Sequence, residues 1–129
     1  MVKLSKEQII LLHSMAINKT GGLDGIRDEG LLESAINSPF QSFGGVELFP
    51  QIESKAAHLA FNIINNHPFL DGNKRIGILV MMVFLEVNNI KLQCSDEDII
   101  DLGIGIAENR YNSEHIEEWI YNKQINQKK

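Results

Sequence analysis

The sequence predicts an all-α protein, a small helical bundle that forms a single domain over residues 1–129. Apolar residues recur at spacings of three and four along most of the chain, which is the period of amphipathic helices. Residues 78–85 are apolar on every side, and a helix of that kind belongs at the centre of a bundle, covered all round. A length of 129 residues fits one domain, and no linker or internal repeat divides the sequence.

The first part of the chain predicts two helices joined by a turn. Ser5 and Gln8 form a capping-box pair ahead of the first helix, which should end before Gly21. Asp28 is a suitable cap for a second, shorter helix. That helix should stop before Pro39, because the residue that precedes a proline disfavours helical backbone.

The stretch from 40 to 50 combines apolar side chains with two glycines. Phe43 and Val46 flank Gly44 and Gly45, so the segment could form a short β-hairpin across the glycines. Its apolar residues are equally consistent with two arrangements. They could fold back onto the core, or they could form a docking surface for another protein.

The second part of the chain predicts four helices. Pro50 opens the first of them, whose apolar residues share one face, and the all-apolar stretch lies in the next. Two C-terminal helices, over about residues 95–122, are expected to begin at the caps Ser95 and Ser113. Apart from the hairpin and a short extended piece at Ile90-Lys91-Leu92, the predicted elements are all helical.

Composition and charge restrict the class of protein. The net charge is -5 and the isoelectric point about 5.3, which argues against direct nucleic-acid binding by a uniformly basic surface. Cys94 is the only cysteine, so no internal disulfide forms, and a lone thiol fits a reducing cytoplasm. The longest apolar run, Ile76–Leu85, is too short to cross a bilayer. We therefore expect a cytoplasmic protein with no membrane partner.

Residues 67–75 form a polar loop between two predicted helices, and the second helix begins inside it. Gly72 allows a ligand to approach the backbone closely. Asn73, Lys74 and Arg75 stand at the start of the apolar helix, where the first N–H groups lack partners. A helix start with a favourable dipole and two cations predicts an anion site, for which a phosphate is the natural occupant.

Four other residues of this loop complete a chemical site. Asp71 is a hard oxygen ligand, and one carboxylate together with phosphate oxygens can hold Mg²⁺. His67 is a base of near-neutral pKa that could accept a proton from an attacking hydroxyl. Pro68 and Phe69 are expected to stiffen and anchor the loop. Together these residue types predict phosphate-transfer chemistry.

Taken singly, these residues have ordinary structural explanations. A histidine after a helix is usually a surface residue or a cap, and Asp-Gly-Asn is a common turn sequence. His13 and His58 lie beside apolar residues on their helices, so we expect them to be partly buried and hydrogen-bonded. Two cations at a helix start oppose the helix dipole, however, and this placement favours a site that binds an anion.

The loop resembles the Fic superfamily motif H-x-F-x-[DE]-G-N-G-R-x-x-R, and Lys74 is similar to its death-on-curing (Doc) branch, H-x-F-x-D-[AG]-N-K-R. The resemblance covers about residues 4–90. Segments outside the loop that also resemble the Doc branch are Gly25-Ile26-Arg27-Asp28, Leu31-Leu32-Glu33-Ser34-Ala35, Phe43-Gly44-Gly45 and Lys55-Ala56-Ala57.

The resemblance implies a small Fic/Doc bundle and a role for each site residue. His67 would activate a Ser or Thr hydroxyl of a target protein, and Asp71 would hold Mg²⁺ on the phosphates of ATP. The implied anion-binding residues are Gly72, Asn73, Lys74 and Arg75. The implied flap that docks the target consists of Phe43, Gly44, Gly45, Val46 and Glu47.

Within this superfamily most members transfer AMP, whereas Doc transfers the terminal phosphate of ATP to elongation factor Tu and is blocked by an antitoxin. Lys74 stands where AMP-transferring relatives have Gly, and Ile78 stands at the second motif arginine; both departures match Doc. The autoinhibitory pattern [ST]-x-x-x-E-[GN] does not occur, so we expect an antitoxin supplied in trans. The expected function is a toxin of a type II toxin–antitoxin system. AMP transfer and a non-catalytic binding module are the alternatives.

Overall fold

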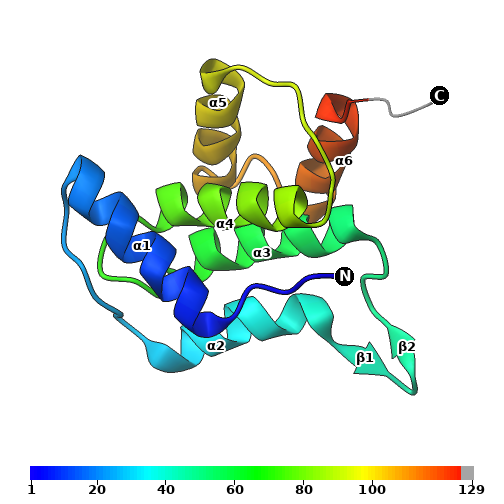
Figure 1. Cartoon of the computed structure of the whole chain (residues 1–129), viewed down its shortest axis with the longest axis horizontal. Coiled ribbons are helices and arrows are strands. Elements are labelled where there is room, and N and C mark those ends of the chain that lie inside the picture. Colours follow the sequence, from blue (N-terminus) through cyan, green and yellow to red (C-terminus); the bar gives the residue numbers. More distant parts are fainter. Residues whose placement is uncertain (126–129) are drawn as a thin grey trace.

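The computed structural model describes residues 1–125, which form six α-helices, a short 3₁₀ helix and one β-hairpin (Figure 1). The elements are α1 (Lys6–Thr20), α2 (Glu29–Asn37), η1 (Ser38–Phe40), β1 (Ser42–Phe43), β2 (Val46–Glu47), α3 (Ile52–Asn66), α4 (Asn73–Val87), α5 (Asp96–Ala107) and α6 (Ser113–Lys123). The predicted all-α class with a small hairpin is confirmed. None of the helices in this part of the chain is both long and apolar enough to span a membrane.

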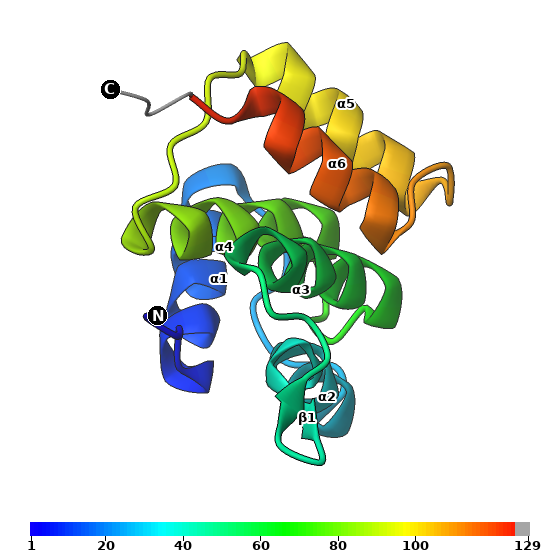
Figure 2. The same cartoon turned by 90° about the vertical axis from the view of Figure 1, so that its right-hand side faces the viewer.

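The helices α3 and α4 pack side by side through the middle of the molecule (Figure 1, Figure 2). Their contact is close at Gly77, where an added Cβ atom would lie 2.7 Å from Ile64 Cγ1 and 3.2 Å from the carbonyl oxygen of Ala60. Gly77 therefore lets the two helix backbones approach closely at this point. Residues 67–75, which we call the site loop, connect α3 to the first turn of α4, so the packing of these two helices also fixes the ends of the loop.

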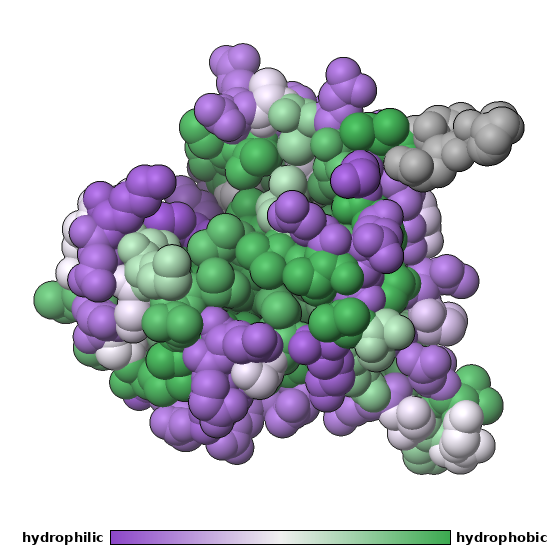
Figure 3. Space-filling model, viewed as in Figure 1, coloured by the Kyte–Doolittle hydropathy of each residue, from purple (hydrophilic) through white to green (hydrophobic). Residues whose placement is uncertain are grey.

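The remaining helices surround this pair, but they do not cover α4 completely. α2 and α6 pack on α3, while α1 and α5 pack on α4. Leu79, Met82 and Val83 of α4 stay half-buried, so the expectation that this helix is covered all round is wrong for one side. In the view of Figure 1 no helix lies over α4 between α1 and α5, and Figure 3 shows apolar surface in the middle of that face.

Helix starts follow the local capping signals, with one shift. Three predicted caps are confirmed, and each accepts a hydrogen bond from the first turn of its helix: Ser5, Asp28 and Ser95. The last helix is capped by Asn112 rather than by Ser113, because the Asn112 side chain accepts a hydrogen bond from the His115 N–H at 2.9 Å. Ser113 is then the first residue of the helix.

The predicted hairpin is confirmed, with Phe43 opposite Val46 across the two glycines. Gly44 and Gly45 have φ values of 58° and 81°, which a two-residue turn of this kind requires. Phe43 is 82% exposed and Val46 68% exposed, so neither side chain folds back onto the core.

The base of the hairpin, in contrast, is held by the body of the molecule. Lys55 of α3 is only 2% exposed. Its ammonium donates to Glu47 Oε1 at 2.6 Å and to the Phe49 carbonyl oxygen. The Phe49 ring also stacks on His58, with 3.7 Å between ring centroids. The segment thus has a base anchored on the core and an apolar tip in solvent, while the docking of another protein at that tip stays a prediction.

Candidate functional site

His67 directly follows α3 as its C-cap, and its backbone is in the left-handed conformation (φ 50°, ψ 55°). A side chain with a Cβ atom disfavours this conformation, so the surrounding contacts must hold it. Arg27 does this: its Nε donates to the His67 carbonyl oxygen at 2.6 Å and its Nη2 to the Asn66 carbonyl oxygen at 2.8 Å. The His67 side chain is exposed, so the imidazole is accessible to a ligand.

The segment before α2, residues 25–27, pairs with residues 68–70 of the site loop like a short antiparallel strand. Ile26 forms an isolated bridge with Phe69, and the Arg27 N–H donates to the Pro68 carbonyl oxygen at 2.7 Å. The Leu70 N–H donates to the Gly25 carbonyl oxygen at 3.0 Å. Pro68 and Phe69 are both buried, as their expected anchoring role requires.

The Asn73 side chain points back into the loop instead of toward a ligand. Its Oδ1 accepts from the Phe69 N–H at 2.9 Å, and its Nδ2 donates to the Phe69 carbonyl oxygen at 3.0 Å. Both hydrogen-bonding atoms of the Phe69 backbone are therefore satisfied by one side chain. What Asn73 can offer an anion is its main-chain N–H at the start of α4.

Asp71 presents an exposed carboxylate that two main-chain N–H groups orient. Oδ1 accepts from Gly72 N–H at 2.8 Å, and Oδ2 accepts from Leu23 N–H at 3.3 Å. A carboxylate has about four acceptor positions, so positions remain for a cation. No group of three or more His, Cys, Asp or Glu gathers within residues 1–125. A hard cation at Asp71 would therefore need phosphate oxygens and water as its other ligands, which is how Mg²⁺ is commonly held.

The start of α4 provides the positive end of the site. Among residues 1–125, no side chain caps its first turn. Lys74 extends along α5, where an added Cβ atom on Gly103 would lie 3.3 Å from Lys74 Cγ. Within the described residues its ammonium makes no ion pair. Arg75 turns the other way, and its Nη1 donates to Thr20 Oγ1 at 2.5 Å, so Lys74 is the cation that is better placed for a ligand.

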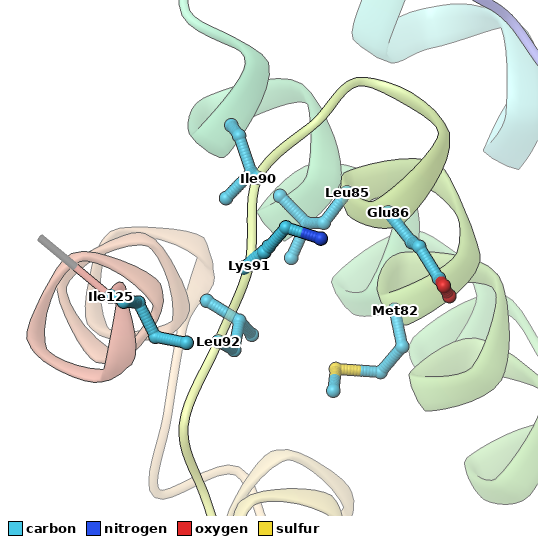
Figure 4. A pocket seen from close by; sticks show the side chains of 7 residues that line it. All are labelled: Met82, Leu85, Glu86, Ile90, Lys91, Leu92 and Ile125. Atoms are coloured by element: carbon cyan, nitrogen blue, oxygen red, sulfur yellow. The ribbon is translucent and has the colours of Figure 1, made fainter. Parts of the chain in front are cut away.

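These residues surround a single hollow with a volume of about 360 Å³. Its lining consists of His67, Leu70, Asp71, Gly72, Asn73, Lys74 and Arg75. A second hollow, shown in Figure 4, lies at the other end of α4 and is lined mainly by apolar residues such as Met82, Ile90 and Leu92. It contains none of the residues predicted for the site. A third hollow, of about 300 Å³, contains Lys74 and Arg75 but neither His67 nor Asp71, so the first hollow is the candidate site.

Two residues of the site went unrecognised in the sequence. His13 is only 1% exposed, and its Nε2 lies 2.7 Å from the main-chain oxygen of Asp71. Its position on the apolar face of the first helix indicated burial but not its partner. Arg27 carried no signal beyond its place in a segment that resembles the Doc branch, because its contacts to Asn66 and His67 span about forty residues.

Fold and site together describe a small helical protein with a His- and Asp-bearing anion loop at the head of its central helix. The family model for the Fic/DOC family matches residues 3–85, and the chain belongs to that family. It is similar to "Toxin Doc" of Mycolicibacterium smegmatis (strain ATCC 700084 / mc(2)155), with 34% identity over 74% of this chain and 71% of that protein. It is also similar to "Protein kinase doc" of Escherichia phage P1, with 32% identity over 81% of each chain.

Proposed function

We propose that the chain is the toxin of a type II toxin–antitoxin system and transfers the terminal phosphate of ATP to a Ser or Thr hydroxyl of a translation factor similar to elongation factor Tu. One observation carries this proposal. An exposed imidazole, an exposed carboxylate and the start of α4, which no side chain within residues 1–125 caps, surround one hollow. The names of the two relatives, a toxin and a protein kinase, support it.

Binding of the triphosphate would rest on the start of α4. The unpaired N–H groups of its first turn and the positive end of the helix dipole attract phosphate oxygens. Lys74 adds a full positive charge at the same place. Asp71 would hold Mg²⁺ on the phosphates, where the ion neutralises charge on oxygen.

His67 would act as the general base. Its imidazole accepts the proton of the target hydroxyl, and the hydroxyl oxygen then attacks the γ-phosphorus of ATP. A new oxygen–phosphorus bond forms as the bond from the γ-phosphorus to the β–γ bridging oxygen breaks. ADP leaves, and the phosphoryl group remains on the target. The Arg27 side chain donates hydrogen bonds to the main-chain oxygens of Asn66 and His67. These bonds would keep His67 in the backbone conformation that directs its side chain to the hollow.

Two positions favour transfer of the terminal phosphate over transfer of AMP. Lys74 places a long cation at the head of α4, where a glycine would leave room for a triphosphate in a different orientation. Ile78 is only 6% exposed and apolar, so it offers no charge to clamp a phosphate one turn further along the helix. The alternative of AMP transfer lacks this clamp.

The partners in this proposal use two further features. The exposed Phe43 and Val46 at the hairpin tip would contact the target protein, next to a strand edge that can pair with an extended segment. A cognate antitoxin would restrain the toxin in the cell. A neighbouring reading frame for a short antitoxin would support this part.

The reaction can be tested with the native chain, Mg²⁺, purified translation factors and ATP labelled at either the γ- or the α-phosphate. We expect the γ-label to reach the target, the α-label to stay in free nucleotide, and His67→Ala to abolish transfer. Transfer of the α-label would overturn phosphate transfer in favour of AMP transfer. Growth arrest by His67→Ala in cells at full strength would instead indicate a binding module.

A further inference from the structure

We infer that His13 is a positioning residue for the Asp71 end of the site: it fixes the peptide between Asp71 and Gly72, and through it the metal-binding carboxylate and the start of α4. This inference rests on the proposed function. The two residues lie 58 positions apart in the sequence, and the bond between them joins the middle of α1 to the loop.

The geometry assigns a donor role to His13. Its Nε2 lies 2.7 Å from the Asp71 carbonyl oxygen, which can only accept a hydrogen bond, so Nε2 carries the hydrogen. The Nδ1 atom faces Asp24 Oδ1 at 3.5 Å, and Ser14 Oγ donates to that same carboxylate oxygen at 3.0 Å. No hydrogen bond joins Nδ1 to Asp24, so the ring is oriented by its contacts with the loop.

The ring of His13 also packs against the site loop. It stacks on Phe69 with 3.9 Å between centroids and 11° between the planes. The Phe69 backbone is itself fixed by the Asn73 side chain. An added Cβ atom on Gly72 would lie 3.8 Å from His13 Nε2, so the loop passes directly over the imidazole. His13 therefore contacts the loop at an aromatic ring and at a carbonyl group, two residues apart.

The planar peptide between Asp71 and Gly72 links the His13 hydrogen bond to the orientation of the Asp71 carboxylate. The Asp71 carbonyl and the Gly72 N–H belong to one planar unit and point in opposite directions. Holding the carbonyl against His13 directs the N–H away from it, where it donates to Asp71 Oδ1 at 2.8 Å. Without the His13 donor the peptide can rotate, and the carboxylate loses this partner. Residues that orient a metal ligand in this way commonly affect metal affinity by ~10–100-fold.

The competing explanation is that His13 only fills space beneath the loop. Two substitutions separate the hydrogen bond from the packing. His13→Phe retains an aromatic ring to stack on Phe69 but has no donor for the Asp71 carbonyl. His13→Gln loses the ring but can place an amide N–H near the position of Nε2. A space-filling role favours Phe, whereas a positioning role favours Gln.

The test measures the dissociation constant of ATP by calorimetry, with and without Mg²⁺, on the full chain. We expect His13→Phe to weaken binding of ATP in Mg²⁺ at least ~10-fold, to change binding without Mg²⁺ much less, and His13→Gln to restore most of the loss. The matched control is His58→Phe. His58 also stacks on a phenylalanine and bonds a main-chain oxygen, at Ser54, but it lies near the hairpin, and its variant should bind ATP normally.

Each outcome has one meaning. If the native chain binds no ATP in Mg²⁺, the proposed function fails and this inference fails with it. If the native chain binds ATP while the Phe and Gln variants lose equal affinity, or neither loses any, only the role of His13 is overturned. Should His13→Phe not fold, as judged by its thermal melt, His13→Asn replaces it. Its shorter amide cannot reach the Asp71 carbonyl, and it should bind ATP in Mg²⁺ more weakly than His13→Gln.

Discussion

At the scale of single residues, the site depends on backbone contacts that orient side chains. His67 and Asp71 both present exposed side chains, yet each is fixed through its main chain, by Arg27 and His13 respectively. Asn73 has the opposite arrangement, because its side chain is used entirely on the Phe69 backbone. A motif of a few residues therefore contains exposed side chains next to a side chain that holds the loop together.

Gly22 gives a prediction at this scale. It has a φ of 121°, and an added Cβ atom would lie 2.8 Å from Asp71 Oδ2. Gly22→Ala should displace the carboxylate and raise the Mg²⁺ concentration needed for half-maximal phosphate transfer several-fold. Gly21→Ala is the control, since Gly21 also has a positive φ of 90° but its added Cβ atom meets nothing within 4 Å. Equal Mg²⁺ requirements in the two variants would contradict this account.

At the scale of elements, the hairpin is held by one buried cation. Lys55 connects α3 to Glu47 and to the Phe49 carbonyl. Lys55→Met should release the base of the hairpin, because the carbonyl loses its donor and Glu47 loses its ion pair. We expect KM for the protein target to rise several-fold while the affinity for ATP is unchanged. Lys6→Met, which removes a surface lysine paired with Glu29 and Glu33, is the control and should leave both values unchanged.

The start of α5 gives a pH-dependent prediction. The Ser95 main-chain N–H, and then Lys123, stabilise the Asp98 carboxylate and hold its pKa below the ordinary value. A carboxyl group whose pKa is lowered by folding stabilises the protein above its unfolded pKa, about 3.9. That contribution is lost as the pH falls through the lowered folded pKa.

Urea unfolding at several pH values tests this. The free energy of unfolding should fall less steeply below about pH 4 in Asp98→Asn than in the native chain. An unchanged slope would show that this carboxylate is not coupled to folding.

At the scale of the whole molecule, the packing of α3 against α4 holds both ends of the site loop. Gly77→Ala would place a Cβ atom 2.7 Å from Ile64 Cγ1 and 3.2 Å from the Ala60 carbonyl oxygen, so the two helices must separate. Overpacking of this kind typically costs ~1–3 kcal/mol. We expect a lower melting temperature, together with weaker ATP binding because the loop ends move apart. Gly30→Ala, on α2 with only Asp28 Oδ1 at 3.5 Å, should not lower the melting temperature, because alanine favours a helix more than glycine does, and it should leave ATP binding unchanged.

The sequence by itself determined the helices, the hairpin and the candidate loop, because each is encoded by contacts within a few residues. Ser5, Asp28 and Ser95 cap the turns that directly follow them, and two adjacent glycines define the hairpin turn. Even Asn112, one residue before the expected cap, follows the same local chemistry.

Only the tertiary structure decided what supports the loop and what covers the central helix. His13 and Arg27 meet the loop across 58 and 40 positions of sequence, and no local pattern specifies such a meeting. The half-buried side of α4 has the same origin. Apolar periodicity tells which face of a helix avoids water, whereas the neighbour that covers the face depends on how all the helices pack together.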